Sequence, residues 1–169
     1  MTTQTNMQPE RRSAIIESGA WNDNIITDYL DQAVLTAQDS VAVIAYRVNE
    51  DERLAFSYRE LDRLVTRMAA GLAGLGVAKS DVVSCQLPNG WQIPALHLAC
   101  VRIGAILNPL MPIFRERELA FMLGHAQSRV LVIPHHFRGF DYAAMVQGMR
   151  GELPALEQVL VIGGDHGDD

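Results

Sequence analysis

The stretch VVSCQLPNGWQIPALHLACVRIGAILN, residues 82–108, decides the fold class of this chain. It opens with a short apolar run, Val82–Leu87, which has the length and composition of a strand. Trp91–Ile103 follows as a helix, in which Pro94 lies early enough to be tolerated. A second short apolar run, Ala105–Asn108, comes after this helix. The order of strand, helix and strand predicts a βαβ unit whose two strands are parallel in one sheet.

The same alternation continues toward the C-terminal end of the chain. Arg115–Ala126 and Tyr142–Met149 have the apolar spacing of helices, and the apolar runs Val130–Ile133 and Val159–Ile162 are strand candidates. We therefore predict an α/β fold of the Rossmann-like type, with all four strands in one mostly parallel sheet. Since the strands are apolar almost throughout, helices should cover both faces of that sheet.

A long helix is predicted before this region. Ser57 and Glu60 have the spacing of a capping box, in which each side chain satisfies a backbone N–H group of the first turn. Gly76 is a natural stop at the other end of the helix. Between these ends an apolar stripe recurs at helical spacing, formed by Leu61, Leu64, Val65, Met68, Leu72 and Leu75.

Two smaller elements are predicted further upstream. Val41–Val48 and Arg53–Phe56 are β-rich runs separated by a short polar connection, which predicts a hairpin. Apolar residues between positions 26 and 34 recur at helical spacing, with Thr27 or Asp23 as the expected cap.

The chain is predicted to divide into three parts. Residues 1–22 show no clear periodicity and are expected to form a flexible leader. Residues 23–162 should form one folded unit, which begins with the helix and the small hairpin and continues with the parallel sheet. The last residues, 163–169, are polar and are expected to be a solvated tail.

Composition is that of an ordinary globular protein. Apolar residues make up 49% of the chain and charged residues 20%, and the net charge of −6 disfavours binding to nucleic-acid backbones. The N-terminal residues lack the apolar core of a secretory signal, and no stretch approaches the roughly 20 apolar residues of a membrane span. Cys85 and Cys100 lie in apolar runs, as buried free thiols do in proteins of a reducing compartment. We therefore expect a cytoplasmic protein.

Residue chemistry alone indicates no assembled active site. Gly71–Ser80 resembles a phosphate-binding loop, but two residues separate Lys79 from Gly76, which it should follow directly. His135 and His136 are adjacent, so they should not share a helix face or a strand face, and no further Cys or His lies at metal-binding spacing. We expect neither a catalytic residue nor a metal site in this chain.

A series of motifs is more informative. FSYREL occupies residues 56–61, GLAGLGVAKSDVV 71–83, QLPNGWQIPALHLACVRIGAILNPLMP 86–112, FRERELAFML 114–123 and SRVLVIP 128–134. This order resembles the N-terminal region of the AMP-forming adenylating enzymes, which comprise acyl-CoA synthetases, luciferases and peptide-synthetase adenylation domains. Within that family the chain is especially similar to bacterial CoA ligases for medium-chain and alicyclic acids, such as cyclohexanecarboxylate. One departure is Ser80, where the family usually has a turn glycine.

The resemblance implies that 23–162 is the N-terminal subdomain of an acyl-CoA synthetase. Such an enzyme uses ATP, Mg²⁺ and CoA: a carboxylate attacks the α-phosphate to give acyl-AMP, and the CoA thiol then displaces AMP. This sequence lacks the motifs with which the family carries out this chemistry. They are a Ser/Thr/Gly-rich loop ending in Pro-Lys-Gly, an aromatic-Thr-Glu motif, a ribose-binding Asp and a lysine on the C-terminal domain. We therefore expect the chain to be a truncated part of the enzyme that is catalytically incompetent alone and requires no cofactor. We also expect it to self-associate through the surface left by truncation.

One residue is assigned a role through the resemblance. Arg138 stands where acetyl-CoA synthetases have an arginine near the CoA phosphates, and it is the candidate CoA contact; a solvated loop arginine is the alternative. Two alternatives for the whole chain also stay open. One is an adenylating enzyme with another acceptor, as in peptide synthetases, and the other is a short, non-enzymatic α/β protein that binds a partner.

Overall fold

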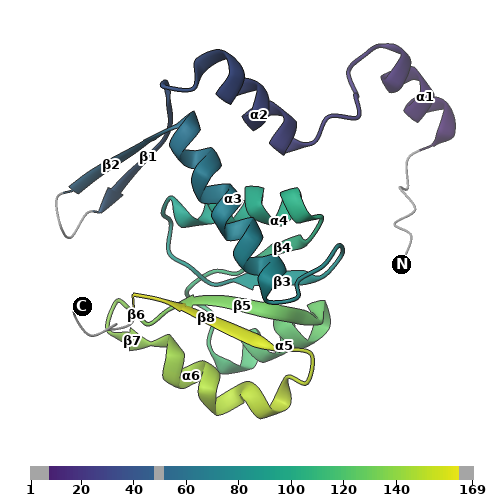
Figure 1. The fold of residues 1–169 in the computed structure, drawn as a ribbon. Coiled ribbons are helices and arrows are strands. Elements are labelled where there is room, and N and C mark those ends of the chain that lie inside the picture. The colour runs from purple at the N-terminus through teal and green to yellow at the C-terminus, as the bar shows by residue number, and fades with distance from the viewer. Residues whose placement is uncertain (1–7, 48–51, 164–169) are drawn as a thin grey trace.

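A four-stranded parallel sheet forms the centre of the molecule (Figure 1). The structure, a computed structural model, describes residues 8–47 and 52–163. The strand order is β4-β3-β5-β8, and every pairing in this sheet is parallel. The prediction of one parallel sheet is confirmed. The strands are β3 (Val82–Cys85), β4 (Ile106–Pro109), β5 (Ser128–Pro134) and β8 (Gln158–Ile162).

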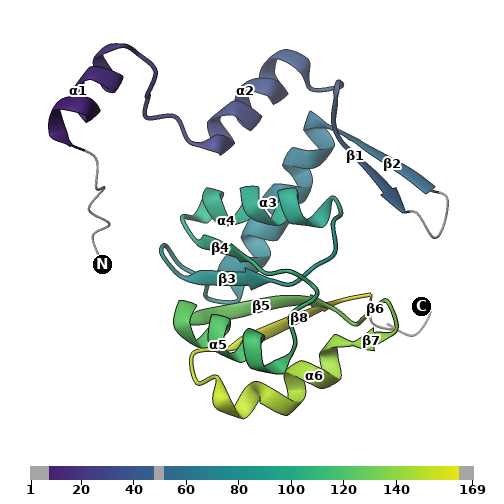
Figure 2. The same ribbon diagram turned by 180° about the vertical axis from the view of Figure 1, so that it is seen from behind.

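Helices cover the two faces of this sheet in pairs (Figures 1 and 2). The pair α3 and α4 packs on one face, and the pair α5 and α6 on the other. The side chains of β5 alternate between the two cores: Val130 and Val132 pack with α3 and α4, whereas Leu131 and Ile133 pack with α5 and α6. This explains why the strand is apolar without interruption. The helices are α3 (Tyr58–Gly74), α4 (Gln92–Ile103), α5 (Glu116–Ala126) and α6 (Tyr142–Met149).

The predicted hairpin and long-helix start are also confirmed. β1 (Val41–Arg47) pairs antiparallel with β2 (Glu52–Ser57). The Glu60 backbone N–H donates to Ser57 Oγ at 3.3 Å, and the Ser57 N–H donates to the Glu60 carboxylate at 2.7 Å. At the far end Gly76 has a φ of +84°, a left-handed conformation that ends the helix at little cost because glycine has no Cβ.

The predictions for the N-terminal part need correction. Helix α2 (Ile26–Ala37) begins after Ile25, whose backbone N–H donates to the Asp28 carboxylate at 2.8 Å. Neither Thr27 nor Asp23 is the cap, because Thr27 lies inside the helix and is buried.

Part of the expected leader is helical. Residues 9–17 form α1 (Pro9–Glu17), which buries no residue and stands apart from the sheet in both views (Figures 1 and 2). A helix with no buried face leaves no apolar stripe in the sequence, so periodicity could not reveal it. Residues 1–7, the connection at 48–51 and residues 164–169 of the polar tail lie outside the described residues.

Three short elements near the C-terminal end were not predicted. They are β6 (His136–Phe137), β7 (Phe140–Asp141) and the 3-10 turn η1 (Arg150–Glu152). Both cysteines are buried free thiols, and burial raises the pKa of Cys100 to about 12. Among the helices of the described residues, none has the length and apolar character needed to cross a membrane.

Candidate functional site

A groove of about 1100 Å³ runs along the carboxyl edge of the sheet. In open α/β sheets ligands bind at this edge, because the loops that follow the strands meet there. The loop after β3 contributes Pro88–Trp91, the loop after β4 contributes Met111–Ile113, and β8 contributes Ile162. The β1–β2 hairpin closes one side with Tyr46 and Leu54. In both views this hairpin and the β6–β7 hairpin lie at the same end of the sheet (Figures 1 and 2).

Arg138 lies in this groove and is the charged side chain among its described lining residues. Arg138 and Gly139 form the turn between β6 and β7, and both have positive φ, +52° and +75°. Two-residue hairpins of type I′ require positive φ at both central positions. The guanidinium is exposed and lies 5.2 Å from the centre of the Phe137 ring. No ion pair within the described residues occupies it, so its N–H groups are available to an anion.

The loop after β4 is held in place by three side chains behind the groove. The Gln86 amide is buried and donates to the carbonyl oxygens of Met111 and Phe114 at 3.1 and 2.9 Å. Tyr142 Oη donates to the Pro112 carbonyl at 2.7 Å. The groove wall is therefore fixed by buried polar contacts that a sequence pattern does not reveal.

Arg115 is the third of these side chains. It donates to the carbonyl oxygens of Pro112 and Phe114 at 2.8 and 2.9 Å. Its guanidinium lies 4.0 Å from the centre of the Phe140 ring, a cation–π contact. Through the two bonds from Nη1 and the contact with Phe140, Arg115 supports the wall of the groove.

The described lining of the groove supplies no acidic residue. Mg²⁺ prefers carboxylate oxygens and water. The residues that line the groove therefore fit an anionic ligand at Arg138 but do not by themselves fit Mg²⁺.

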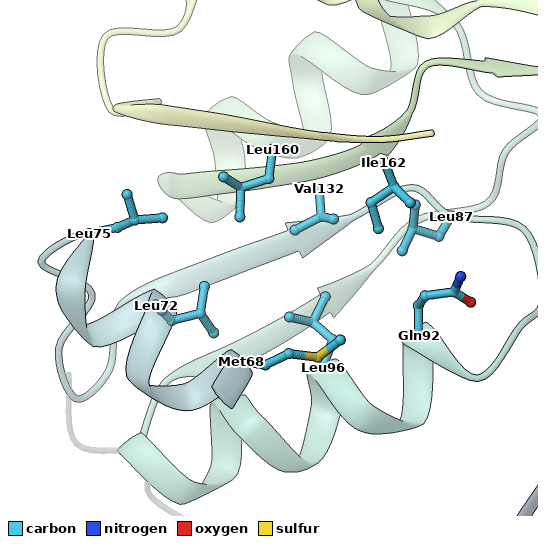
Figure 3. A pocket seen from close by; sticks show the side chains of 10 residues that line it. Met68, Leu72, Leu75, Leu87, Gln92, Leu96, Val132, Leu160 and Ile162 are labelled. Atoms are coloured by element: carbon cyan, nitrogen blue, oxygen red, sulfur yellow. The ribbon is translucent and has the colours of Figure 1, made fainter. Parts of the chain in front are cut away.

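An apolar cavity of about 440 Å³ lies beside the groove (Figure 3). Figure 3 shows side chains from α3, α4, β5 and β8 directed into it. Leu87, Gln92 and Ile162 line both this cavity and the groove. The cavity lies between the helices α3 and α4 and the strands β5 and β8. Its remaining lining residues are Met68, Gly71, Leu72, Leu75, Leu96, Val132 and Leu160.

The adjacent histidines do converge, contrary to the expectation from the sequence. His135 Nδ1 lies 3.1 Å from His136 Nδ1, and the two rings meet edge to face. The chain bends at His135 between β5 and β6, so the alternation of a regular strand does not apply. Asp141 joins them from β7, with Oδ2 3.4 Å from His136 Nε2. The pairing of β6 with β7, which the sequence analysis missed, brings this carboxylate to the histidines.

Comparison with known proteins agrees with the resemblance seen in the sequence. Residues 30–168 match the family described as "AMP-binding enzyme". The medium-chain fatty-acid–CoA ligase of Escherichia coli K12 is 28% identical over 151 residues, which cover 89% of this chain and 26% of that ligase. The salicyl-AMP ligase / salicyl-S-ArCP synthetase of Mycobacterium tuberculosis is 32% identical over 154 residues, covering 91% of this chain and 27% of that protein.

A solved structure gives the same result in three dimensions. The apo structure of MbtA from Mycobacterium smegmatis superposes with a TM-score of 0.79 at 31% identity, over 95% of this chain and 28% of that one. The chain thus spans about a quarter of the length of the relatives it matches. The family match covers most of the chain and includes the whole parallel sheet. The chain therefore belongs to the AMP-binding enzyme family of adenylate-forming ligases.

Proposed function

We propose that this chain is the N-terminal subdomain of an acid–CoA ligase, which activates a carboxylic acid as acyl-AMP and transfers the acyl group to CoA. The supporting observation is the family match over residues 30–168 together with a groove at the carboxyl edge of the sheet. In this proposal the chain supplies walls of the nucleotide and CoA sites. ATP, Mg²⁺ and CoA are cofactors of the complete enzyme, and residues outside this sequence carry out the chemistry.

The proposed acid is fatty or alicyclic. The similarity to a medium-chain fatty-acid–CoA ligase supports an apolar acid. The cavity beside the groove is lined mostly by apolar side chains of the sheet and its helices, which is compatible with an apolar acid. We place the enzyme in the cytoplasm, where CoA and ATP are available.

A second candidate is an adenylating enzyme that uses another acceptor. The relative named salicyl-AMP ligase / salicyl-S-ArCP synthetase favours it, because this name specifies an aromatic acid and a product other than a CoA thioester. Both candidates share the first half-reaction. They differ in the acid and in the thiol that accepts the acyl group.

ATP–pyrophosphate exchange tests the shared half-reaction. We expect exchange from an enzyme that joins this chain to the family's phosphate loop and C-terminal lysine, with octanoate or cyclohexanecarboxylate as the acid. The 169-residue chain alone should remain at background, because it lacks the groups that stabilise charge on the transferring phosphate. Exchange by the pure chain would show that its chemistry has been assigned to the wrong residues.

Product analysis separates the two candidates. With CoA present, the first candidate predicts that octanoate or cyclohexanecarboxylate is converted to its CoA thioester. Exchange with salicylate and no acyl-CoA product would instead support the second candidate. Absence of exchange with all three acids in the joined enzyme would contradict both.

A further inference from the structure

Three metal-ligating side chains converge at the edge of the groove. His135, His136 and Asp141 each offer one ligand atom, and these atoms lie within 4.8 Å of one another. The two Nδ1 atoms are 3.1 Å apart, and Asp141 Oδ2 is 3.4 Å from His136 Nε2. Side chains of His136 and Asp141 are 54% and 42% exposed, so an ion in solution can reach them.

The backbone fixes the positions of all three residues. His136 and Asp141 are direct cross-strand partners in the β6–β7 hairpin. The His135 backbone N–H donates to the Ile162 carbonyl at 2.8 Å, and its carbonyl accepts from Tyr142 N–H at 3.0 Å. His135 is therefore tied both to β8 and to the start of α6. The cluster follows from strand pairing and does not depend on a chance approach of surface rings.

Asp141 retains an oxygen for a ligand. Its Oδ1 accepts the Ala144 backbone N–H at 2.8 Å and caps α6, whereas Oδ2 faces His136. The hydrogen bond from Ala144 lowers the pKa of Asp141, and the two nearby histidines lower it further. Oδ2 is thus the carboxylate oxygen that remains for a cation.

We propose that His135, His136 and Asp141 form a site for one divalent transition-metal ion such as Zn²⁺. Two ring nitrogens 3.1 Å apart require a shared proton, and a metal ion can take the place of that proton. With metal–nitrogen bonds of about 2.0–2.1 Å this separation corresponds to a ligand–metal–ligand angle of roughly 100°, near that of a tetrahedron. Asp141 Oδ2 faces Nε2, the other ring nitrogen of His136, so the exposed side chains of His136 and Asp141 have to turn for the carboxylate to join this ion, and water completes the coordination.

The ligand set selects against Mg²⁺. Imidazole nitrogens suit Zn²⁺, Ni²⁺, Co²⁺ and Cu²⁺, whereas Mg²⁺ takes oxygen ligands. The site is therefore separate from the Mg²⁺ that the proposed ligase reaction uses. It does not depend on the proposed function, because all of its ligands belong to this chain.

Binding at this site would stiffen the turn that carries Arg138. The ion would join His135 at the end of β5 to Asp141 at the start of α6, and Arg138 lies on the turn between them. The Arg138 guanidinium lines the groove. The ion would therefore hold this guanidinium in one position from which it can bind an anionic ligand.

Calorimetric titration of the untagged chain with ZnCl₂ tests the site. We expect one equivalent to bind, and His135→Gln and His136→Gln should each weaken binding at least about tenfold, or about 1.4 kcal/mol. Amide hydrogen exchange at Arg138 and Gly139 should slow when Zn²⁺ is added. A large excess of Mg²⁺ should leave the titration unchanged.

His125→Gln is the matched control. This histidine lies on α5, is also exposed, and stacks on Phe121 instead of facing another ligand. Its variant should bind Zn²⁺ as the unmodified chain does. The proposal is overturned if the chain binds Zn²⁺ no more tightly than the His135 and His136 variants, or if His125→Gln weakens binding as much as they do.

Discussion

At Ser80 a side chain occupies a backbone conformation that suits glycine. Its φ is +73°, in the left-handed region, where Cβ lies too close to the following carbonyl oxygen. The family usually has glycine here, and the structure gives the physical reason. Ser80→Gly should raise the free energy of unfolding by about 0.5–1 kcal/mol, because relief of this contact exceeds the added entropy of the unfolded chain. Urea denaturation monitored by circular dichroism measures the change.

Ala78→Gly, two residues earlier in the same exposed turn, is the control. Ala78 is not among the described residues with positive φ, so glycine there adds flexibility to the unfolded chain without relieving a contact. We expect this variant to lose about 0.4–1 kcal/mol. Equal effects of the two substitutions would contradict the explanation from φ.

Arg138 carries the residue-scale prediction for function. In the complete ligase, Arg138→Ala should raise the Michaelis constant for CoA more than that for ATP, because a guanidinium binds phosphate through two parallel hydrogen bonds. Arg117→Ala, an exposed arginine on α5, should leave both constants unchanged. If the CoA constant is the same after Arg138→Ala, the alternative of a solvated turn arginine is supported instead.

The sequence was least informative for individual site residues. The resemblance named Arg138, but only the structure shows that it lines the groove from a hairpin turn. The contacts of Gln86 with Met111 and Phe114 were missed, because they join residues distant in sequence. The convergence of the histidines was excluded by a rule for regular strands that fails at a bend.

At the scale of elements, an ion-pair chain joins the amino ends of three strands. Arg129, on β5, donates to Asp81 Oδ2 at 2.7 Å and to Glu157 Oε2 at 2.9 Å, residues that immediately precede β3 and β8. Two hydrogen bonds hold the pKa of Asp81 below its ordinary value. The larger effect comes from the Ala78 backbone N–H and the smaller one from the Arg129 guanidinium. These contacts fix the positions at which parallel strands enter the sheet.

The sign of the pKa shift determines how stability depends on pH. A carboxyl group whose folded pKa is lowered contributes stability above its unfolded pKa of about 3.9, and this contribution is lost as the pH falls through the folded value. Asp81→Asn keeps the acceptor for Ala78 and removes the charge. We expect it to cost about 1 kcal/mol at pH 7, with a smaller difference from the unmodified chain at about pH 3.

Asp39→Asn is the control for this ion pair. Asp39 pairs with Arg59 at 3.1 Å but is mostly exposed, so its contribution should be smaller at both pH values. Denaturation midpoints at pH 7 and pH 3 give the comparison. A loss from Asp81→Asn that stays the same at both pH values would contradict the assigned role of its charge.

Elements with a strong local signal were predicted, and those without one were not. Long apolar periods and the Ser57–Glu60 capping box identified the helices and strands of the sheet region. Helix α1 buries nothing, and the β6–β7 turn uses Arg-Gly instead of the usual Asn-Gly or Asp-Gly. Helix α1 therefore lacks apolar periodicity, and the β6–β7 hairpin lacks the residue pair by which such a turn is predicted from sequence.

At the scale of the whole molecule, the two faces of the sheet are covered unequally. Each face has one apolar core, with α5 and α6 on one side and α3 and α4 on the other, and only on the α3–α4 side of the described sheet does the apolar cavity lie next to β8. Strand β5 is apolar from Val130 to Ile133, where it contacts both cores, so the sequence predicted that helices cover both faces of the sheet. The incomplete cover over β8 depends on where two helices cross the sheet, which no local pattern specifies.

The exposed edge of β8 leads to a prediction of self-association. β8 is the terminal strand of the sheet, so one side of its backbone has no strand partner within the described residues, and Val161 at this edge is 41% exposed. An apolar edge strand next to an apolar cavity favours pairing with a second copy. Light scattering should therefore show a mass that rises with concentration. Val161→Lys should shift the chain toward the monomer, because a charged edge opposes strand pairing. Leu35→Lys alters a side chain that is 86% exposed on α2, a helix that lies away from β8 (Figure 1), so it should leave the mass unchanged. A monomer at every concentration, or equal effects of the two lysines, would show that β8 is not the contact.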